Sequence, residues 1–152
     1  MIKDDAYFMA IALKEAKKAA LHDEVPVGAV IVLGDKVISK AYNKRVEKEQ
    51  THAHAEMLAI QKANKKLNSW RLEDCKLYVT LEPCPMCAGA IIQSRMKTVV
   101  YGAKDPKGGV AGSIMNLFDI KFNHQVEVIG GILEEACSNE LKSFFKQLRN
   151  KS

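Results

Sequence analysis

The sequence predicts an α/β protein in which helices cover a mixed, five-stranded sheet. Two observations support this fold class. Apolar strand-like segments alternate with segments of helical periodicity, and a two-residue turn separates the first two strand-like segments. The length of 152 residues suits one domain over residues 1–152, with enough chain to bury a sizeable core. The chain contains no linker, low-complexity stretch or internal repeat that would divide it.

The first half of the chain should supply a helix, a hairpin and a second helix. Apolar residues recur at three- and four-residue intervals near the N-terminus, which predicts a helix with one face packed inward. A run rich in valine and isoleucine then meets a Gly-Asp turn and returns, as in a hairpin. The expected elements are a helix from Asp4 or Asp5 to about His22, strands over 27–33 and 36–42, and a helix capped by Thr51 and ending near Leu67.

The second half should continue the alternation of strands and helices. A glycine-rich stretch over 102–113 follows the fourth strand. Because helices follow strands through most of the chain, we expect them to cover the faces of a mixed sheet. The expected elements are a strand over 76–81, a helix from Cys84 to about Arg95, strands over 98–101 and 125–129, and an amphipathic helix over 133–149.

The chain is basic, with a formal net charge of +5 and a pI of about 9.0. This balance is weakly typical of a protein with a polyanionic partner. The distribution of charge says more, because residues 142–152 carry four cations and no acid. Two interpretations stay open for this segment: a contact surface for nucleic acid, or a solvated helix end whose cations complement the negative pole of the helix.

Nothing in the sequence indicates a membrane protein or a secreted one. No run of about 18 apolar residues occurs, and the N-terminus carries acids early and lacks an apolar signal core. We therefore expect a cytoplasmic protein with no membrane contact. The four cysteines favour metal binding over disulfides, because two of them are spaced Cys-x-x-Cys.

Two cysteines and a histidine form a candidate metal site. Cys84 and Cys87 are three residues apart at a predicted helix start, so both sulfurs can face one ion. Pro85 suits the first helical position, and the positive helix pole stabilises the thiolates that bind metal. His54 lies near the start of another helix. If the two helix starts meet at one edge of the sheet, the three side chains come together.

This set of donors favours zinc with one open coordination position. Two thiolates and one imidazole suit a borderline-soft, tetrahedral ion, and a structural site usually has four protein ligands. Cys75 and Cys137 lack the paired spacing and are expected to be small buried side chains. Three ligands plus water is the catalytic pattern. Taken alone, Cys-x-x-Cys could also be a redox pair or half of a structural site, and Glu56 a surface acid. His52 competes with His54 as a ligand, but no acid stands two residues after it.

At these residues the chain resembles the zinc-dependent nucleoside and base deaminases of the cytidine and deoxycytidylate deaminase superfamily. The resemblance is closest to the members that act on adenosine in tRNA, and it extends over nearly the whole chain. It implies a three-layer α/β/α fold of the cytidine-deaminase type, one zinc ion per subunit and a homodimer. The stretches that carry it are 24–29, 51–56, 69–72, 77–90, 99–109 and 144–145.

The resemblance also implies an activity. Such enzymes deaminate the wobble adenosine, position 34, of the tRNA anticodon to inosine, typically in arginine tRNA. Glu56 would move a proton from the attacking water to the ring nitrogen beside the attacked carbon, and later to ammonia. The implied binding roles are zinc for His54, Cys84 and Cys87, the flipped base for Asn43, Val27 and the Ala55 backbone, the flanking nucleotides for Asp105, and the anticodon loop for Phe145 and Arg149.

The sequence departs from the family pattern in places. Pro85 stands where a small apolar residue is more usual, which a helix start tolerates. Residues 107–109 fit the flanking-nucleotide loop only loosely.

Two alternatives differ in class from this interpretation. A free-base or nucleotide deaminase, for cytosine, guanine or deoxycytidylate, would share the zinc core. The 70–72 stretch, the basic last helix and the compact length argue against it. A zinc-stabilised RNA-binding module or an inactive partner subunit would not be an enzyme, and the intact Glu56 argues against the inactive subunit.

Overall fold

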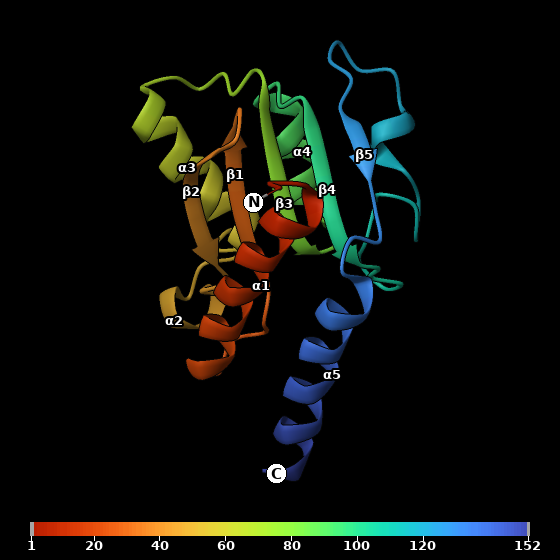
Figure 1. Cartoon of the computed structure of the whole chain (residues 1–152). Helices are drawn as coiled ribbons and strands as arrows, with labels where there is room; N and C mark the ends of the chain where they lie inside the picture. The colour runs from red at the N-terminus through yellow and green to blue at the C-terminus, as the bar shows by residue number, and fades with distance from the viewer. Residues whose placement is uncertain (1, 152) are drawn as a thin grey trace.

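A mixed five-stranded sheet forms the centre of the computed structural model, which describes residues 2–151 (Figure 1). The strands are arranged in the order β2-β1-β3-β4-β5. β1 pairs antiparallel with β2 and β3, whereas β3, β4 and β5 run parallel. The predicted mixed sheet is therefore confirmed. The elements are α1 (Asp5–Leu21), β1 (Gly28–Leu33), β2 (Lys36–Tyr42), α2 (Arg45–Lys48), α3 (Ala55–Leu67), β3 (Cys75–Leu81), α4 (Pro85–Gln93), β4 (Thr98–Ala103), η1 (Leu117–Asp119), β5 (Glu127–Ile129) and α5 (Glu134–Asn150).

Helices cover both faces of the sheet, as the three-layer prediction requires. α1 and α5 lie on one face, and α3 and α4 lie on the other (Figure 1). Each face has its own apolar core. Phe8, Val30 and Tyr78 belong to the core under α1, whereas Ile31, Leu77 and Ile91 belong to the core under α3 and α4. Neighbouring residues of β1 thus face opposite layers, which follows from the two-residue period of a strand.

Several strand ends and two helix starts lie at one edge of the sheet, and they position the candidate site. β2, β3 and β4 end there, and β1 begins there, because Gly28 pairs with Tyr42 and Leu81 pairs with Ala103. α3 and α4 start at the same edge, since each follows a strand that ends there. Two helix N-termini therefore open side by side, which was the condition for the predicted metal site.

Most predicted boundaries agree with the structure to within about two residues. Asp4 caps α1, with its side chain accepting a hydrogen bond from the Tyr7 backbone N–H (2.9 Å). The predicted cap at Thr51 is wrong: α3 begins at Ala55, and His54 is its N-cap. A turn ends at Ala53, whose carbonyl accepts a hydrogen bond from the Lys44 backbone N–H (3.0 Å). The short helices α2 and η1 were not predicted. None of the helices described between residues 2 and 151 has the length and apolar composition of a membrane span.

Candidate active site

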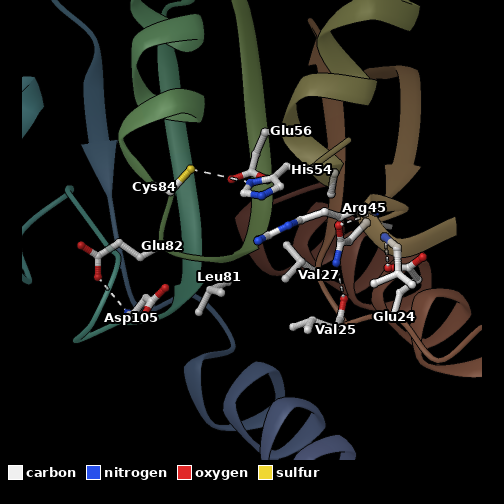
Figure 2. A pocket seen from close by; sticks show the side chains of 13 residues that line it. Glu24, Val25, Val27, Arg45, His54, Glu56, Leu81, Glu82, Cys84 and Asp105 are labelled. Carbon is white, nitrogen blue, oxygen red and sulfur yellow. Dashed lines mark hydrogen bonds between the residues drawn. The ribbon is translucent and has the colours of Figure 1, made fainter. Parts of the chain in front are cut away.

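A cavity of about 460 Å³ opens at the edge of the sheet where α3 and α4 begin (Figure 2). Its size is that of a small-molecule site. The structure places seven of the ten predicted site residues in its lining. Three unpredicted groups accompany them: apolar side chains, two glutamates and an arginine. The lining consists of Glu24, Val25, Val27, Asn43, Arg45, Val46, His54, Ala55, Glu56, Leu81, Glu82, Cys84 and Asp105.

The three predicted metal ligands lie together beside this cavity. The His54 Nδ1 atom is 3.6 Å from the Cys84 sulfur and 3.5 Å from the Cys87 sulfur. All three donor atoms lie within 4.8 Å of one another. A tetrahedral zinc ion with usual bond lengths separates a bound nitrogen and a bound sulfur by about 3.6 Å. The donor set and its spacing therefore fit zinc.

The chain positions these donors through the two helix starts. Cys84 is the N-cap of α4, with Pro85 at the first helical position, as predicted. His54 is the N-cap of α3 and makes no side-chain capping hydrogen bond, which leaves its ring to face the sulfurs. Cys87 is fully buried in the first turn of α4. Both helix poles point positive charge at the sulfurs, so the site suits thiolates.

The protonation of the three groups is linked. Hydrogen bonds from Cys87 and His54 lower the pKa of the Cys84 thiol to about 4, although burial opposes this. The pKa of Cys87 is raised by its hydrogen bond to Cys84 and by burial. The hydrogen bond to Cys84 also raises the pKa of His54. A metal ion bound by these three donors would balance the charge of the thiolates.

Glu56 lies in the first turn of α3 and is 4% exposed, so it is not a surface acid. Burial raises the pKa of its carboxyl to about 7, although its own backbone N–H and the Cys87 thiol favour the ionised form. A carboxyl with a pKa near neutral can both accept and donate a proton at physiological pH. Figure 2 shows it beside two of the metal-binding side chains, His54 and Cys84.

Apolar and amide groups form the floor of the cavity beside the metal-binding side chains. Val27 and Ala55 are buried there, and Asn43 is 8% exposed. The Asn43 amide donates to the Val25 carbonyl (3.2 Å) and accepts from the Arg45 backbone N–H (3.2 Å). These two bonds orient the side chain and leave one N–H and one lone pair for another partner.

One wall of the cavity is the loop that contains Asp105. The Asp105 side chain accepts hydrogen bonds from the backbone N–H groups of Lys107 (3.2 Å) and Gly108 (3.1 Å). Its backbone N–H donates to the buried carboxylate of Glu82 (3.0 Å). The loop is thus closed on itself and tied to the chain just before Cys84.

The opposite wall contains residues that sequence reasoning missed. Arg45 extends its guanidinium into the cavity, between His54 and Val27 (Figure 2). Glu24, which is 2% exposed, accepts hydrogen bonds from the backbone N–H groups of Val46 (3.1 Å) and Glu47 (2.6 Å). A signal for both buried glutamates existed in the sequence. Each stands next to or near a proline at the boundary of an apolar strand, where an unpaired acid would be costly.

Phe145 and Arg149 do not reach this cavity, whose described lining includes no residue of α5. Both are exposed side chains on α5, which extends past the edge of the sheet where the cavity opens (Figure 1). The end of α5 lies close to the chain just before Glu24, which belongs to the wall opposite Asp105, since Lys151 pairs with Asp23 at 3.7 Å. The two residues therefore belong to the surroundings of the cavity.

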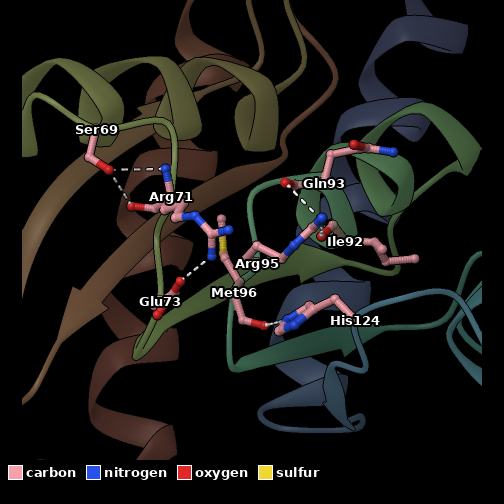
Figure 3. A network of polar contacts seen from close by, with 8 residues as sticks. All are labelled: Ser69, Arg71, Glu73, Ile92, Gln93, Arg95, Met96 and His124. Carbon is pink, nitrogen blue, oxygen red and sulfur yellow. Dashed lines mark hydrogen bonds and ion pairs between the residues drawn. The ribbon is translucent and has the colours of Figure 1, made fainter.

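The stretch over 70–72 lies away from the cavity. Leu72 is fully buried, and Arg71 forms an ion pair with Glu73 (Figure 3). The Arg71 guanidinium lies 4.8 Å from the ring centre of Trp70, which is exposed. A second, polar cavity of about 670 Å³ adjoins this stretch. His124 lies in its lining and forms a hydrogen bond with the Met96 carbonyl (2.7 Å). Within this chain, the stretch thus provides no contact to the first cavity.

The remaining cysteines and His52 follow the simpler expectations. Cys75 and Cys137 are 0% and 1% exposed, and burial raises the pKa of both thiols. His52 is exposed in the turn before α3. Only His54 among the described histidines joins a cluster of three donors that could hold a metal ion.

Comparison with known proteins identifies the family. The family of MafB19-like deaminases matches residues 2–149. The tRNA-specific adenosine deaminase of Bacillus subtilis (strain 168) is 54% identical over 152 residues, which cover 99% of this chain and 94% of the relative. The chain belongs to the tRNA-specific adenosine deaminases. The candidate cavity and the cluster of His54, Cys84 and Cys87 therefore lie in a protein of this deaminase family.

Solved structures of the family have the same architecture. A structure from a study of A-to-I editing by tRNA:A34 deaminases at the wobble position superposes with a TM-score of 0.86. It is 43% identical and covers 89% of this chain and 99% of its own. A guanine deaminase from Bacillus subtilis is more distant, with 30% identity, a TM-score of 0.61 and coverage of 76% and 84%. The fold is thus shared among deaminases that act on different bases, and the degree of sequence identity distinguishes the two structures from each other.

Proposed function

We propose that this protein deaminates the wobble adenosine, position 34, of a tRNA anticodon and produces inosine and ammonia. One observation carries the proposal: His54, Cys84, Cys87 and Glu56 meet at one cavity, in a chain of the family named for this reaction. Adenosine deamination needs water, a Lewis acid and a proton shuttle. The cavity brings together groups that suit the last two of these.

In this proposal His54, Cys84 and Cys87 hold one zinc ion. Bound zinc would supply the Lewis acidity that makes a water molecule nucleophilic near neutral pH. Glu56 accepts a proton from the attacking water and delivers it to the ring nitrogen beside the attacked carbon. It then takes the second proton from the hydroxyl group that the water has added to the ring, and delivers it to the amino group, which leaves as ammonia. The buried position of Glu56 supports this role, because burial raises the pKa of its carboxyl to about 7.

The floor of the cavity would recognise the flipped base. Val27 offers an apolar surface for the ring, and Asn43 has one N–H and one lone pair that its two backbone bonds leave available. The Ala55 and Cys84 backbones border the same space. A base must leave its stack to reach such a site, which is easiest in a single-stranded anticodon loop.

The rim would bind the rest of the anticodon loop. In the proposal Asp105 on one wall contacts nucleotides that flank the target, and Arg45 on the other meets a phosphate; their presence in the lining supports these roles. Phe145 and Arg149 on α5 extend the surface toward the anticodon stem. Their exposure at the open edge of the sheet supports this assignment.

We further propose a homodimer of single-domain subunits that works in the cytoplasm and acts on arginine tRNA. Large apolar side chains that stay exposed support a protein partner, because contact with a partner would remove them from water. Trp70, Ile114, Met115 and Phe122 are all more than 40% exposed. Sedimentation at several protein concentrations tests the dimer, and a panel of purified tRNAs with adenosine at position 34 tests the choice of arginine tRNA.

The function is tested by offering the zinc-loaded protein an anticodon stem-loop RNA with adenosine at the wobble position. Mass spectrometry should detect inosine there, and a stem-loop with guanosine at that position should not react. Free adenosine, cytidine, cytosine, guanine and deoxycytidylate are offered in parallel. Turnover of a free base or nucleotide, with none of the RNA, would favour the alternative deaminase. Tight RNA binding without any turnover would favour a non-enzymatic module.

A further inference from the structure

Glu82 is a buried acid beside the cavity that the proposed chemistry does not use. It follows β3, stands two residues before Cys84 and is 2% exposed. One of its carboxylate oxygens accepts hydrogen bonds from the Asp105 backbone N–H (3.0 Å) and the Ser113 hydroxyl (2.5 Å). The other accepts from the backbone N–H groups of Ala111 (2.8 Å) and Ser113 (3.1 Å). All four donors belong to the loop over 105–113.

The loop is shaped to wrap around this carboxylate. A side chain at Gly109 could not be accommodated, because an added Cβ would lie 2.3 Å from the Glu82 carboxylate carbon. The flanking backbone follows the same path: Val110 donates to the Pro83 carbonyl (3.0 Å), and Glu82 donates to the Ala103 carbonyl (2.8 Å). Glu82 thus joins the metal-binding helix start to the loop that carries Asp105.

The opposite wall is held in a comparable way. Glu24 is also 2% exposed and accepts two backbone hydrogen bonds from α2, beside Arg45. Two buried glutamates therefore each bind the backbone of one cavity wall. They come from different strand boundaries and share no partner, so each wall can be loosened separately.

We propose that Glu82 is a positioning residue, which holds the 105–113 loop in the shape that binds the nucleotide flanking the target adenosine. It acts through Asp105 and not by contacting the reacting atoms, since the loop occupies both of its oxygens. The inference rests on the proposed function, because the nucleotide is that of the anticodon loop. In Glu82→Gln the shape of the side chain is kept, but an amide group would face backbone N–H donors.

Steady-state kinetics on the anticodon stem-loop tests this role. Glu82→Gln should raise KM about tenfold or more, the range for a lost hydrogen bond to a charged group, and change kcat much less. Zinc content should stay that of the unaltered protein. Hydrogen exchange should accelerate within the 105–113 loop and not at α3. Ser113→Ala, which removes one donor and keeps the carboxylate, should raise KM in the same direction by a smaller factor.

A double-mutant cycle separates positioning from general stabilisation. Asp105→Ala should raise KM, and adding Glu82→Gln should increase it little further if both act through one loop. Glu24→Gln alters the matched buried acid on the other wall. In the double variant with Asp105→Ala, the two increases in KM should therefore multiply. The proposal is overturned if the increases in KM from Glu82→Gln and Asp105→Ala also multiply, if Glu82→Gln lowers the zinc content, or if it leaves KM unchanged.

The exchange measurement keeps this inference separate from the proposed function. If the unaltered protein fails to deaminate the stem-loop, the proposed function fails. Faster exchange confined to 105–113 in Glu82→Gln would still support the positioning of the loop. Unchanged exchange there would contradict it.

Discussion

Glu56 illustrates how burial decides what a single side chain can do. In the sequence it is an acid near a helix start, a position at which acids are common and solvated. In the structure it is almost fully enclosed and faces the thiol of Cys87. Enclosure disfavours its charge, which raises the pKa of its carboxyl to about 7 and suits it to carry protons.

Replacing Glu56 by alanine or glutamine should remove deamination and leave the fold and zinc content intact. A lost proton shuttle lowers turnover by about 10²- to 10⁴-fold. Inosine formation is measured by mass spectrometry, and bound zinc by elemental analysis. Glu73→Ala, which alters an exposed acid on the far side of the molecule, serves as the control. Undiminished inosine formation in Glu56→Gln would refute the assigned role.

Tyr78 should make stability depend on pH in the alkaline range. Its hydroxyl donates to the Asp5 carboxylate (2.7 Å), and burial together with this acid raises the pKa of the phenol. An unfolded tyrosine ionises near pH 10, so the unfolded chain releases a proton that the folded chain keeps. The contribution of Tyr78 is therefore complete below about pH 10 and lost as pH rises toward the folded pKa.

Tyr78→Phe tests this sign directly. At pH 7 the variant should lose about 1 kcal/mol of unfolding free energy with the hydrogen bond. Between about pH 9 and about pH 11 its deficit relative to the unaltered protein should shrink, because only the tyrosine ionises on unfolding. Urea unfolding at each pH measures both. A deficit that stays constant over this range would contradict the shifted pKa.

The helix starts of α3 and α4 form a unit that a metal ion would complete. Their N-caps, His54 and Cys84, come from segments 30 residues apart, and their donor atoms are 3.6 Å apart. A cation bound by all three donors would hold the two helix starts together, so its binding would contribute to the stability of the fold.

Removing zinc should therefore lower stability as well as activity. A ligand present at a thousandfold excess over its Kd stabilises a fold by about 4 kcal/mol, so chelation should lower Tm by roughly 8–16 °C. Thermal unfolding with and without EDTA measures the shift. The matched control is the double variant Cys84→Ser with Cys87→Ser, whose Tm should not respond to EDTA. An equal response in both proteins would place the effect outside this site.

Two glycines in different elements should respond to alanine in opposite directions. At Gly28, in β1, an added Cβ would lie 2.0 Å from the Ala12 carbonyl oxygen of α1, so this helix could not pack as it does. At Gly89, within α4, no heavy atom of the described residues lies within 4 Å of an added Cβ. Gly28→Ala should lose about 2–3 kcal/mol of unfolding free energy. Gly89→Ala should gain about 0.5–1 kcal/mol, because alanine stabilises a helix interior. Chemical unfolding compares the two, and equal effects would contradict the packing of α1 on β1.

The molecule as a whole carries a positive net charge. The net charge is +5. The second half of α5 is exposed and cationic, and it lies at the edge of the sheet where the cavity opens. Charge of this kind attracts nucleic acid and makes its binding depend on salt. The candidate cavity and this cationic surface are therefore built from different parts of the chain.

Arg149→Ala should weaken binding of the anticodon stem-loop and leave zinc content unchanged. A lost phosphate contact reduces the slope of log affinity against log salt by about 1. Binding titrations at several salt concentrations measure the slope. Lys36→Ala removes the same charge from the hairpin turn at the opposite end of the sheet, and its slope should remain that of the unaltered protein. An unaltered slope in Arg149→Ala would count against a phosphate contact.

Local patterns predicted much of this protein correctly. The hairpin, the sheet segments and the long helices follow from periodicity, and the start of α4 follows from Cys84 and Pro85. The wrong cap at Thr51 has a tertiary cause, since the Ala53 carbonyl is held by Lys44 and the helix begins after it. The short helix α2 depends on hydrogen bonds that its backbone N–H groups donate to a distant acid, Glu24, and no local pattern contains this acid.

The chemical identity of the site was present in the chain itself, because ligand types and their spacing at helix starts are local properties. His54, Cys84, Cys87 and Glu56 could all be named from the amino-acid sequence. The walls of the cavity could not, because they depend on which segments meet. Arg45 enters the cavity, and Glu24 and Glu82 hold its walls, only after the sheet brings distant strand ends to one edge. Burial then converts the Glu56 acid into a group that can move protons, and burial is a property of the folded whole.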